Sequence, residues 1–173
     1  MSGAEILLVE DDEVLSDIIG RNLRARGHSV SVAPDMQSAL ESLRSHHFDL
    51  VVLDINLPDQ TGWEMLREAL HEGTLHPYEL DGQKLPVVVL SAVDVSPRRM
   101  AEFRPLAYLP KPFPLDSLLR LAAEAAQRKN GGEVYEQADN ENALLTFSKK
   151  EEDLNARGPA EEQREPGAGN SSF

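Results

Sequence analysis

Short runs of hydrophobic residues recur along the chain, and each run is only long enough for a β-strand. Residues 50–53 are four apolar residues in a row, which is typical of a strand that is buried on both faces. Residues 29–33 instead alternate between polar and apolar side chains, which also suits a short strand. The pattern predicts five strands, at residues 5–9, 29–33, 50–53, 86–90 and 106–109.

Between these runs, apolar residues recur three or four positions apart, which is the spacing of an amphipathic helix. Asp35 and Thr61 are residue types that cap helix N-termini, and each precedes such a segment. One predicted helix is short and has only Met100 and Phe103 on its apolar face. The helices are expected at residues 13–26, from the cap Asp35 to Leu43, from the cap Thr61 to Leu70, at 97–103 after Ser96, and at 115–128.

The alternation of strands and helices predicts an α/β fold, because parallel strands must be joined by crossover connections that are usually helices. We expect a doubly wound, five-stranded parallel sheet with helices on both faces. Residues 73–85 interrupt the pattern, since they are mostly polar and contain one Pro and two Gly. They predict a long loop before the fourth strand.

The composition changes after Arg128. Residues 129–173 carry ten acidic and five basic residues and end in a stretch rich in Gly, Pro, Asn and Ser. We therefore divide the chain into a folded domain at residues 1–128 and a low-complexity acidic tail at residues 129–173, which we predict to be mostly disordered. Within that tail, Glu141–Leu154 has enough apolar residues for a weak helix.

The charge balance excludes several classes of function. Lys and Arg total 17 against 30 Asp and Glu, which gives a formal net charge of −13. Non-specific binding to nucleic acid or to an anionic membrane needs a basic surface, so neither is expected. The chain has no cysteine, which removes disulfides and thiolate metal sites.

No targeting or membrane segment is recognisable in the sequence. The N-terminal residues MSGAEILLVEDD lack the features of a signal peptide, and no apolar run approaches the ~20 residues of a membrane-spanning helix. No second folded domain is predicted after residue 128, so we expect no DNA-binding or enzymatic effector. The sequence thus predicts a cytoplasmic protein that works through contact with other proteins.

Charged residues or a hydroxyl residue directly follow four of the predicted strands. Glu10 and Asp11 follow the first strand, Asp54 the third, Ser91 the fourth and Lys111 the fifth. In a parallel sheet the carboxyl ends of all strands lie at one edge, where open α/β sheets place their sites. Carboxylates ~4 Å apart repel by roughly 4 kcal/mol at an effective dielectric constant near 20. A bound hard cation, Mg²⁺, is the simplest reason for gathering them.

These residue types together suit phosphoryl transfer. Asp54 would attack phosphorus and form an acyl phosphate. The metal ion would screen the repulsion between this carboxylate and the phosphoryl oxygens. Lys111 would supply a positive charge to the same oxygens, and the Ser91 hydroxyl a hydrogen bond.

The chain from about Glu5 to Arg128 resembles the receiver domain of two-component response regulators. The resemblance rests on ILLVEDD for the acidic pair, VVLDINLPDQTG for the phosphorylation site, VVVLSA for the hydroxyl and YLPKPF for the lysine. It implies a flavodoxin-like sheet with strand order 2-1-3-4-5. It also implies that Asp54 accepts a phosphoryl group from the phosphohistidine of a histidine kinase or a phosphotransfer protein.

The resemblance further implies a role for each site residue. Glu10, Asp11, Asp54 and the main-chain carbonyl of Asn56 would bind Mg²⁺. Ser91 and Tyr108 match the switch pair of the family, whose hydroxyl moves onto the phosphoryl group while the aromatic ring turns inward.

The output surface implied by the resemblance is the fourth helix, fifth strand and fifth helix, here residues 95–128. It would control an unidentified downstream protein, and a homodimer through this surface is possible. Such a protein is a signalling switch that assists its own phosphorylation and slow dephosphorylation, and is otherwise not an enzyme.

Three features depart from the family pattern. The connection at residues 73–85 is long, and the Gly-Ala pair common before the fifth strand is replaced by Arg104-Pro105-Leu106-Ala107. The interval from Ser91 to Lys111 is slightly short, so we expect a trimmed or distorted fourth helix. These changes fall on the switching side and leave the acidic residues intact.

Three alternative hypotheses stay open at this point. The chain could be a degenerate receiver that serves as a phosphorylation-independent scaffold. It could be a haloacid-dehalogenase-type phosphatase, but those enzymes need a second Asp where this chain has Asn56, which cannot act as a general acid. It could be a flavodoxin-like cofactor carrier, although the sequence after the first strand is acidic and not rich in Ser, Thr or Gly.

Overall fold

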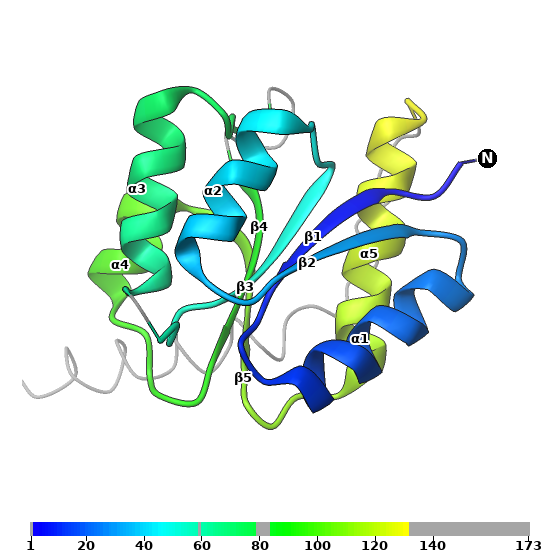
Figure 1. Ribbon diagram of the computed structural model, residues 1–173, viewed down its shortest axis with the longest axis horizontal. Helices are drawn as coiled ribbons and strands as arrows, with labels where there is room; N and C mark the ends of the chain where they lie inside the picture. The colour runs from blue at the N-terminus through cyan, green and yellow to red at the C-terminus, as the bar shows by residue number, and fades with distance from the viewer. Residues whose placement is uncertain (1, 59, 79–83, 132–173) are drawn as a thin grey trace, which may run out of the picture. The chain divides into compact units, whose positions relative to one another are not determined.

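The computed structural model describes residues 2–58, 60–78 and 84–131. In Figure 1, five strands form a single sheet with helices on either side. The strands are β1 (Glu5–Val9), β2 (Ser29–Ala33), β3 (Leu50–Asp54), β4 (Leu85–Ser91) and β5 (Pro105–Pro110). The helices are α1 (Glu13–Ala25), α2 (Met36–Ser45), α3 (Gly62–Glu72), α4 (Pro97–Phe103) and α5 (Leu115–Lys129).

The sheet is parallel throughout, with strand order β2-β1-β3-β4-β5. This confirms the predicted doubly wound α/β fold and its strand order. β1 and β3 are neighbours, with Val9 beside Leu53, and Asp54 at the end of β3 pairs with Leu90 of β4. The strand ends that carry the candidate residues therefore share one edge.

Several element boundaries differ from the prediction by one or two residues. β3 continues through Asp54, and β4 runs from Leu85 to Ser91, so the loop ends before Leu85. β5 includes a proline at each end, because Pro105 pairs with Leu85 and Pro110 with Ser91. The first helix ends at Ala25, one residue early, and the last extends to Lys129, one residue late.

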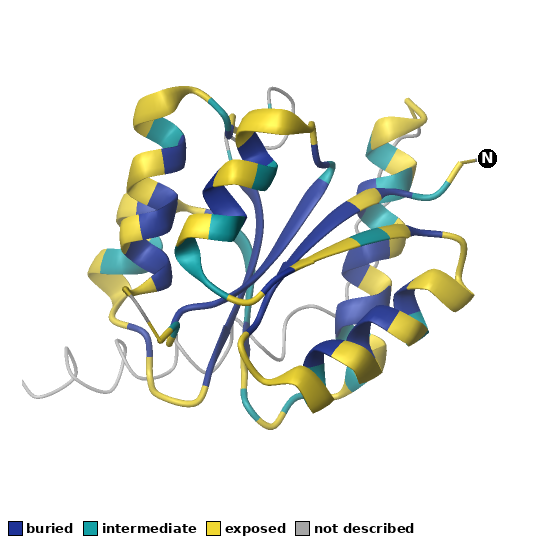
Figure 2. Cartoon of the chain, in the orientation of Figure 1, coloured by how far each residue is buried: buried dark blue, intermediate teal, exposed yellow. Residues whose placement is uncertain are grey.

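Two hydrophobic clusters hold the layers together. Alternate residues of the central strands face opposite sides: Leu7 joins the cluster under α2, α3 and α4, whereas Leu8 joins the cluster under α1 and α5. Both faces of the central strands are therefore buried, as Figure 2 shows by colour. This double burial is why the central strands are continuous hydrophobic runs in the sequence.

Local interactions fix where the helices begin. The side chains of Asp12 and Asp35 accept hydrogen bonds from the first-turn amides of α1 and α2. Thr61 and Glu64 form a capping box at the start of α3, in which each side chain bonds the main chain of the other residue. α3 then ends at Gly73, whose positive φ of 68° closes the helix without the steric cost of a side chain.

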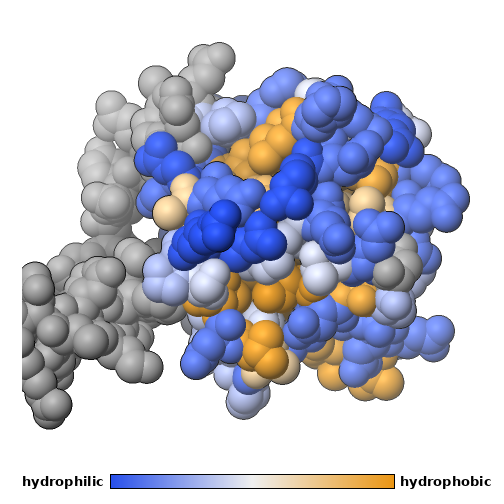
Figure 3. Space-filling view, turned by 90° about the vertical axis from the view of Figure 1, so that its left-hand side faces the viewer, coloured by the Kyte–Doolittle hydropathy of each residue, from blue (hydrophilic) through white to orange (hydrophobic). Residues whose placement is uncertain are grey.

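α4 forms despite its sparse apolar face because it packs on α3. The ring of Phe103 stacks on that of Trp63, with 5.3 Å between the ring centroids. Glu102 pairs with Arg67 of α3 and with Arg99 of its own helix. Figure 3, which looks onto the side of the molecule that carries α3 and α4, shows a mostly hydrophilic surface with small hydrophobic patches among the described residues.

The described residues between α3 and β4 contain no helix or strand, in agreement with the predicted loop. The main-chain N–H of Tyr78 donates to the carbonyl of Lys84 at 2.8 Å, which brings these two residues together. Of the tail predicted to be disordered at residues 129–173, Lys129 belongs to α5, and residues 132–173, with the predicted weak helix at Glu141–Leu154, lie outside the described part of the chain. Among the described helices, none is long and apolar enough to cross a membrane.

A buried histidine makes stability depend on pH. His28 is 7% exposed, and its Nδ1 accepts the N–H of Ala4 at 3.1 Å. Burial, with a smaller contribution from the charge of Arg26, lowers the pKa of His28 below its ordinary value of 6.5. The unfolded chain therefore binds a proton that the folded chain does not, and stability falls as the pH drops below that value.

We expect His28→Gln to flatten this pH dependence. Urea unfolding of the wild type should give a lower free energy at pH 5.5 than at pH 7.0, with a slope from this residue of at most about 1.4 kcal/mol per pH unit. The exposed His46→Gln serves as the control and should keep the wild-type slope. An equal slope in the wild type and His28→Gln would show that His28 is not responsible.

Candidate functional site

The site lies where β1 and β3 end, at the carboxyl edge of the sheet. Asp54 is the last residue of β3, and Glu10 and Asp11 follow β1 directly. Gly62, at the start of α3, lies against the main chain of Asp54 and Ile55, since a Cβ there would fall 2.8 Å from the Ile55 Cα. Glycine thus lets α3 begin directly behind the end of β3.

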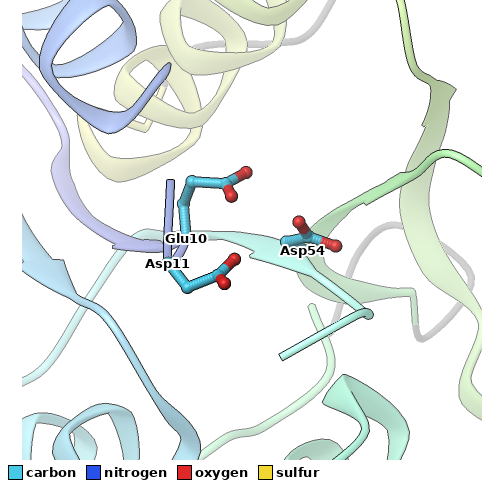
Figure 4. Close-up of side chains that lie close together, drawn as sticks. All are labelled: Glu10, Asp11 and Asp54. Carbon is cyan, nitrogen blue, oxygen red and sulfur yellow. The ribbon is translucent and has the colours of Figure 1, made fainter. Parts of the chain in front are cut away.

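Three carboxyl groups meet at this edge. One oxygen from each of Glu10, Asp11 and Asp54 lies within 4.8 Å of the other two. Glu10 and Asp54 are 2% and 4% exposed, whereas Asp11 faces solvent. In Figure 4 the side chains of Glu10 and Asp11 extend from neighbouring positions toward that of Asp54. The structure brings together the acidic residues that the strand ends predicted.

Lys111, the residue after the outer strand β5, reaches the same site. Its Nζ donates to Glu10 Oε2 at 2.8 Å and to Asp54 Oδ2 at 2.7 Å. The main-chain N–H of Lys111 donates to the carbonyl of Ser91 at 2.7 Å, which fixes its backbone beside β4. The following peptide bond, to Pro112, is cis. One ammonium group therefore bridges the two buried carboxylates.

The other oxygens of these carboxylates are held by the main chain. The N–H of Asp12 donates to Glu10 Oε1 at 3.2 Å, and the N–H of Asn56 donates to Asp54 Oδ1 at 2.8 Å. Both groups are thus oriented by one bond to Lys111 and one to their own loop. Fixed side chains of this kind need little reorganisation when a ligand arrives.

Burial and charge oppose each other in this cluster. Burial raises the pKa of Glu10 above its ordinary value, against the lowering effect of the hydrogen bond from Lys111. Burial alone would lower the pKa of Lys111, but its hydrogen bonds to Asp54 and Glu10 outweigh burial and raise it. Lys111 therefore stays protonated and provides the positive charge of the site.

The residues present fit a hard divalent cation. Carboxylate oxygens from three side chains are the ligand type that Mg²⁺ prefers, and the exposed Asp11 leaves a side open to water and substrate oxygens. Asn56, whose main-chain carbonyl was predicted as a further ligand, follows Asp54 by two residues and forms an isolated bridge with Thr61. The hydrogen bond from its N–H to Asp54 Oδ1 ties Asn56 to the acidic residues.

Ser91 lies at the end of β4 as predicted, but its hydroxyl turns into its own loop. It donates to the carbonyl of Val93 at 2.8 Å and accepts from the N–H of Val93 at 3.1 Å. The hydroxyl of Tyr108 donates to the same Val93 carbonyl at 3.2 Å. Sequence reasoning named Ser91 and Tyr108 but missed this shared acceptor, because a main-chain oxygen leaves no signal in the sequence.

An apolar hollow of about 510 Å³ lies next to Lys111. It is lined mainly by α1 and by the residues after β5, including Ile18 and Phe113. Ile18 of α1, which lines this hollow, is 47% exposed.

The comparisons with known proteins agree on one family. The sequence profile described as the response regulator receiver domain matches residues 6–123. The response regulator protein PmrA of Pseudomonas aeruginosa is 38% identical over 128 residues, which cover 73% of this chain and 54% of that protein. The transcriptional regulatory protein QseB of Escherichia coli O157:H7 is 34% identical, with 84% and 63% covered. The chain thus spans a little over half the length of these curated relatives.

Solved structures show the same fold. A CheY-like receiver domain protein from Methanospirillum hungatei has a TM-score of 0.60 at 24% identity, and the match covers 76% of this chain and 100% of that one. The receiver domain of a Pseudomonas aeruginosa sensor histidine kinase has a TM-score of 0.57 at 29% identity, with 76% and 100% covered. That structure holds a magnesium ion coordinated in its active-site cleft.

Proposed function

Because this chain belongs to the response regulator receiver domain family, we propose that it is a phosphorelay switch that accepts a phosphoryl group on Asp54. The observation that carries this proposal is the position of Lys111, whose Nζ is 2.7 Å from Asp54 and 2.8 Å from Glu10. A cation between two buried acids can stabilise negative charge that is brought to Asp54. The proposed receiver domain comprises residues 1–128.

In the proposed reaction, an oxygen of Asp54 forms a bond to phosphorus while the bond from phosphorus to a histidine nitrogen of the donor breaks. The imidazole leaves with the electron pair of that bond and takes up a proton. The N–H of Asn56 holds Asp54 in one orientation, and Lys111 moves its hydrogen bonds onto the incoming phosphoryl oxygens. Mg²⁺ bound by Glu10, Asp11, Asp54 and the Asn56 carbonyl would neutralise charge on those oxygens.

The proposed switch involves the shared carbonyl of Val93. To bond a phosphoryl oxygen, the Ser91 hydroxyl must leave the carbonyl that it now shares with Tyr108. The loop that follows β4 then changes shape, and the position of the Tyr108 ring against the hydrophobic cluster changes with it. The surface from residue 95 to residue 128 would carry this change to an unidentified downstream protein or to a second copy of the chain.

The switch can be tested with beryllofluoride, which mimics a phosphoryl group on a carboxylate. We expect Mg²⁺ and beryllofluoride together to shift the backbone amide NMR signals of residues 91–95 and of Tyr108. The shifts should be absent without Mg²⁺, because the negative charge on the fluorine atoms, which stand in for phosphoryl oxygens, is then not compensated. An unchanged spectrum with both reagents present would contradict the proposal.

A variant of the exposed acid refines this test. Asp11→Asn removes one carboxylate charge from the proposed metal site, and we expect it to raise the Mg²⁺ concentration needed for the shifts by about tenfold. Asp17→Asn, which alters an exposed acid on α1, is the matched control and should require the wild-type concentration.

The protein that donates the phosphoryl group is proposed to contact the apolar hollow beside Lys111. We expect Ile18→Asp to slow phosphorylation by a donor protein at least about tenfold, because it places a charge in the contact. Phosphorylation by acetyl phosphate, which needs no docking, should keep its wild-type rate. Equal slowing with both donors would show that the substitution damages the site itself.

Other hypotheses receive less support from the site. A haloacid-dehalogenase-type phosphatase would need a general acid where Asn56 lies, and Asn56 cannot supply a proton in that role. A scaffold that works without phosphorylation would not require the bridging contacts of Lys111. A cytoplasmic location and the absence of direct DNA binding stay predictions.

A further inference from the structure

The end of α5 is fastened at the edge of the sheet opposite the acidic site (Figure 1). Asp49, directly before β3, is the centre of these contacts. Its carboxylate accepts the N–H of Glu5 at 2.7 Å and pairs with Lys129 of α5 at 3.0 Å. Its main-chain carbonyl accepts the hydroxyl of Tyr78 at 2.8 Å. One residue thus joins β1, α5 and the segment between α3 and β4.

Tyr78 makes a second contact with the same helix. The guanidinium of Arg128 lies over the Tyr78 ring, 5.0 Å from its centroid, which is a cation–π geometry. The main-chain N–H of Tyr78 donates to the carbonyl of Lys84, so both the backbone and the side chain of this residue are held in place. The long connection before β4 therefore contributes a side chain that bridges α5 and the sheet.

The N-terminus adds to this fastening. The side-chain amide of Asn130, the residue after α5, donates to the carbonyl of Ser2 at 3.1 Å. Lys129 reaches the carbonyl of Gly3 at 3.5 Å while it pairs with Asp49. The last turn of α5 is thus tied to two other parts of the domain by polar contacts.

We propose that Asp49 and Tyr78 form a latch that keeps the last turns of α5 in place while the opposite edge of the domain switches. The switching part rests on the proposed function, and the latch itself does not. The chain continues beyond α5, and it matches only 54% of PmrA, a longer relative. A fixed α5 end would give whatever follows the domain a constant point of attachment.

Hydrogen exchange tests the latch without any phosphoryl mimic. Tyr78→Phe removes the bond to the Asp49 carbonyl but keeps the ring under Arg128, and Lys129→Met removes the ion pair. We expect the amides of residues 126–130 to exchange about threefold to tenfold faster in each variant, and those of residues 118–121 to be unchanged. Unchanged exchange at 126–130, or equal acceleration along all of α5, would overturn the latch.

Matched controls separate the latch from general effects of the substitutions. Arg44→Met removes an ion pair between α2 and α3, and Arg21→Met removes an exposed ion pair on α1. Neither control should accelerate exchange at residues 126–130. Acceleration by either one would mean that this helix end responds to any loss of stability, and the latch would be rejected.

Beryllofluoride with Mg²⁺ then tests the role of the latch in switching. In the wild type, amide shifts should stop before residue 130, and in the double variant Tyr78→Phe/Lys129→Met they should extend to residues 130–131. Shifts that reach residue 130 in the wild type, or that stop at the same place in both proteins, would overturn this role. The complete absence of shifts would refute the proposed function, while the exchange measurements would still decide the latch.

Discussion

Replacing Asp54 with Asn is expected to abolish phosphorylation. The amide of Asn is a far weaker nucleophile than a carboxylate, and the substitution removes the carboxylate that the proposed reaction modifies. With acetyl phosphate and Mg²⁺, the wild-type protein should gain one phosphoryl group, which intact-protein mass spectrometry detects in seconds to minutes of reaction. Asp54→Asn should gain none, a loss of at least about a hundredfold in rate.

The matched control for this prediction is Asp35→Asn. Asp35 caps α2 with its side chain and lies away from the acidic site, and Asn caps helices about as well as Asp, so the same chemical change there should have little effect on stability. Its phosphorylation should be normal. Equal incorporation of phosphorus by Asp54→Asn and the wild type would place the acceptor on another residue and would refute the proposed function.

Replacing Lys111 with Met is expected to change both chemistry and stability. Phosphorylation should fall steeply, because the positive charge that bridges Glu10 and Asp54 also stabilises the incoming phosphoryl oxygens. Without metal, the two buried carboxylates lose their common cation. The side chain of Lys111 is 21% exposed, so solvent reduces the cost, and we expect a destabilisation of roughly 2 kcal/mol.

Mg²⁺ should restore much of that stability, since it replaces the lost positive charge. Thermal unfolding with EDTA and with Mg²⁺ measures this, and the rise in Tm caused by Mg²⁺ should be larger in Lys111→Met than in the wild type. Lys129→Met removes an ion pair far from the site and should show the wild-type response to Mg²⁺. A smaller response in Lys111→Met than in the wild type would mean that Lys111 helps to hold the metal and does not substitute for it.

The fold was predictable because the central strands are buried on both faces and so are continuous apolar runs in the sequence. The exact ends of the strands could not be predicted, because a strand ends where its neighbour stops pairing. Pro105, for example, belongs to β5 through its pairing with Leu85, although a proline offers no N–H to a ladder. The capping box of α3 was a missed signal that the sequence does contain, as Thr61 followed by Glu64.

The acidic residues and Lys111 could be predicted together because parallel topology places the carboxyl ends of all strands at one edge. Two features of the site and its surroundings could not. The shared acceptor of Ser91 and Tyr108 is a main-chain oxygen, and any residue at position 93 would supply it. The contacts of Tyr78 depend on where the segment after α3 places this side chain, which hydrophobic spacing does not encode.

The prolines at both ends of β5 have a consequence for how this domain meets other proteins. β5 is an outer strand of the sheet, and a bare outer strand can recruit a strand from another molecule through main-chain hydrogen bonds. With Pro105 and Pro110 as its terminal residues, only the short stretch from Leu106 to Leu109 offers uninterrupted amides. Strand addition and amyloid-like stacking are therefore disfavoured at this border, and any partner that binds there must recognise side chains.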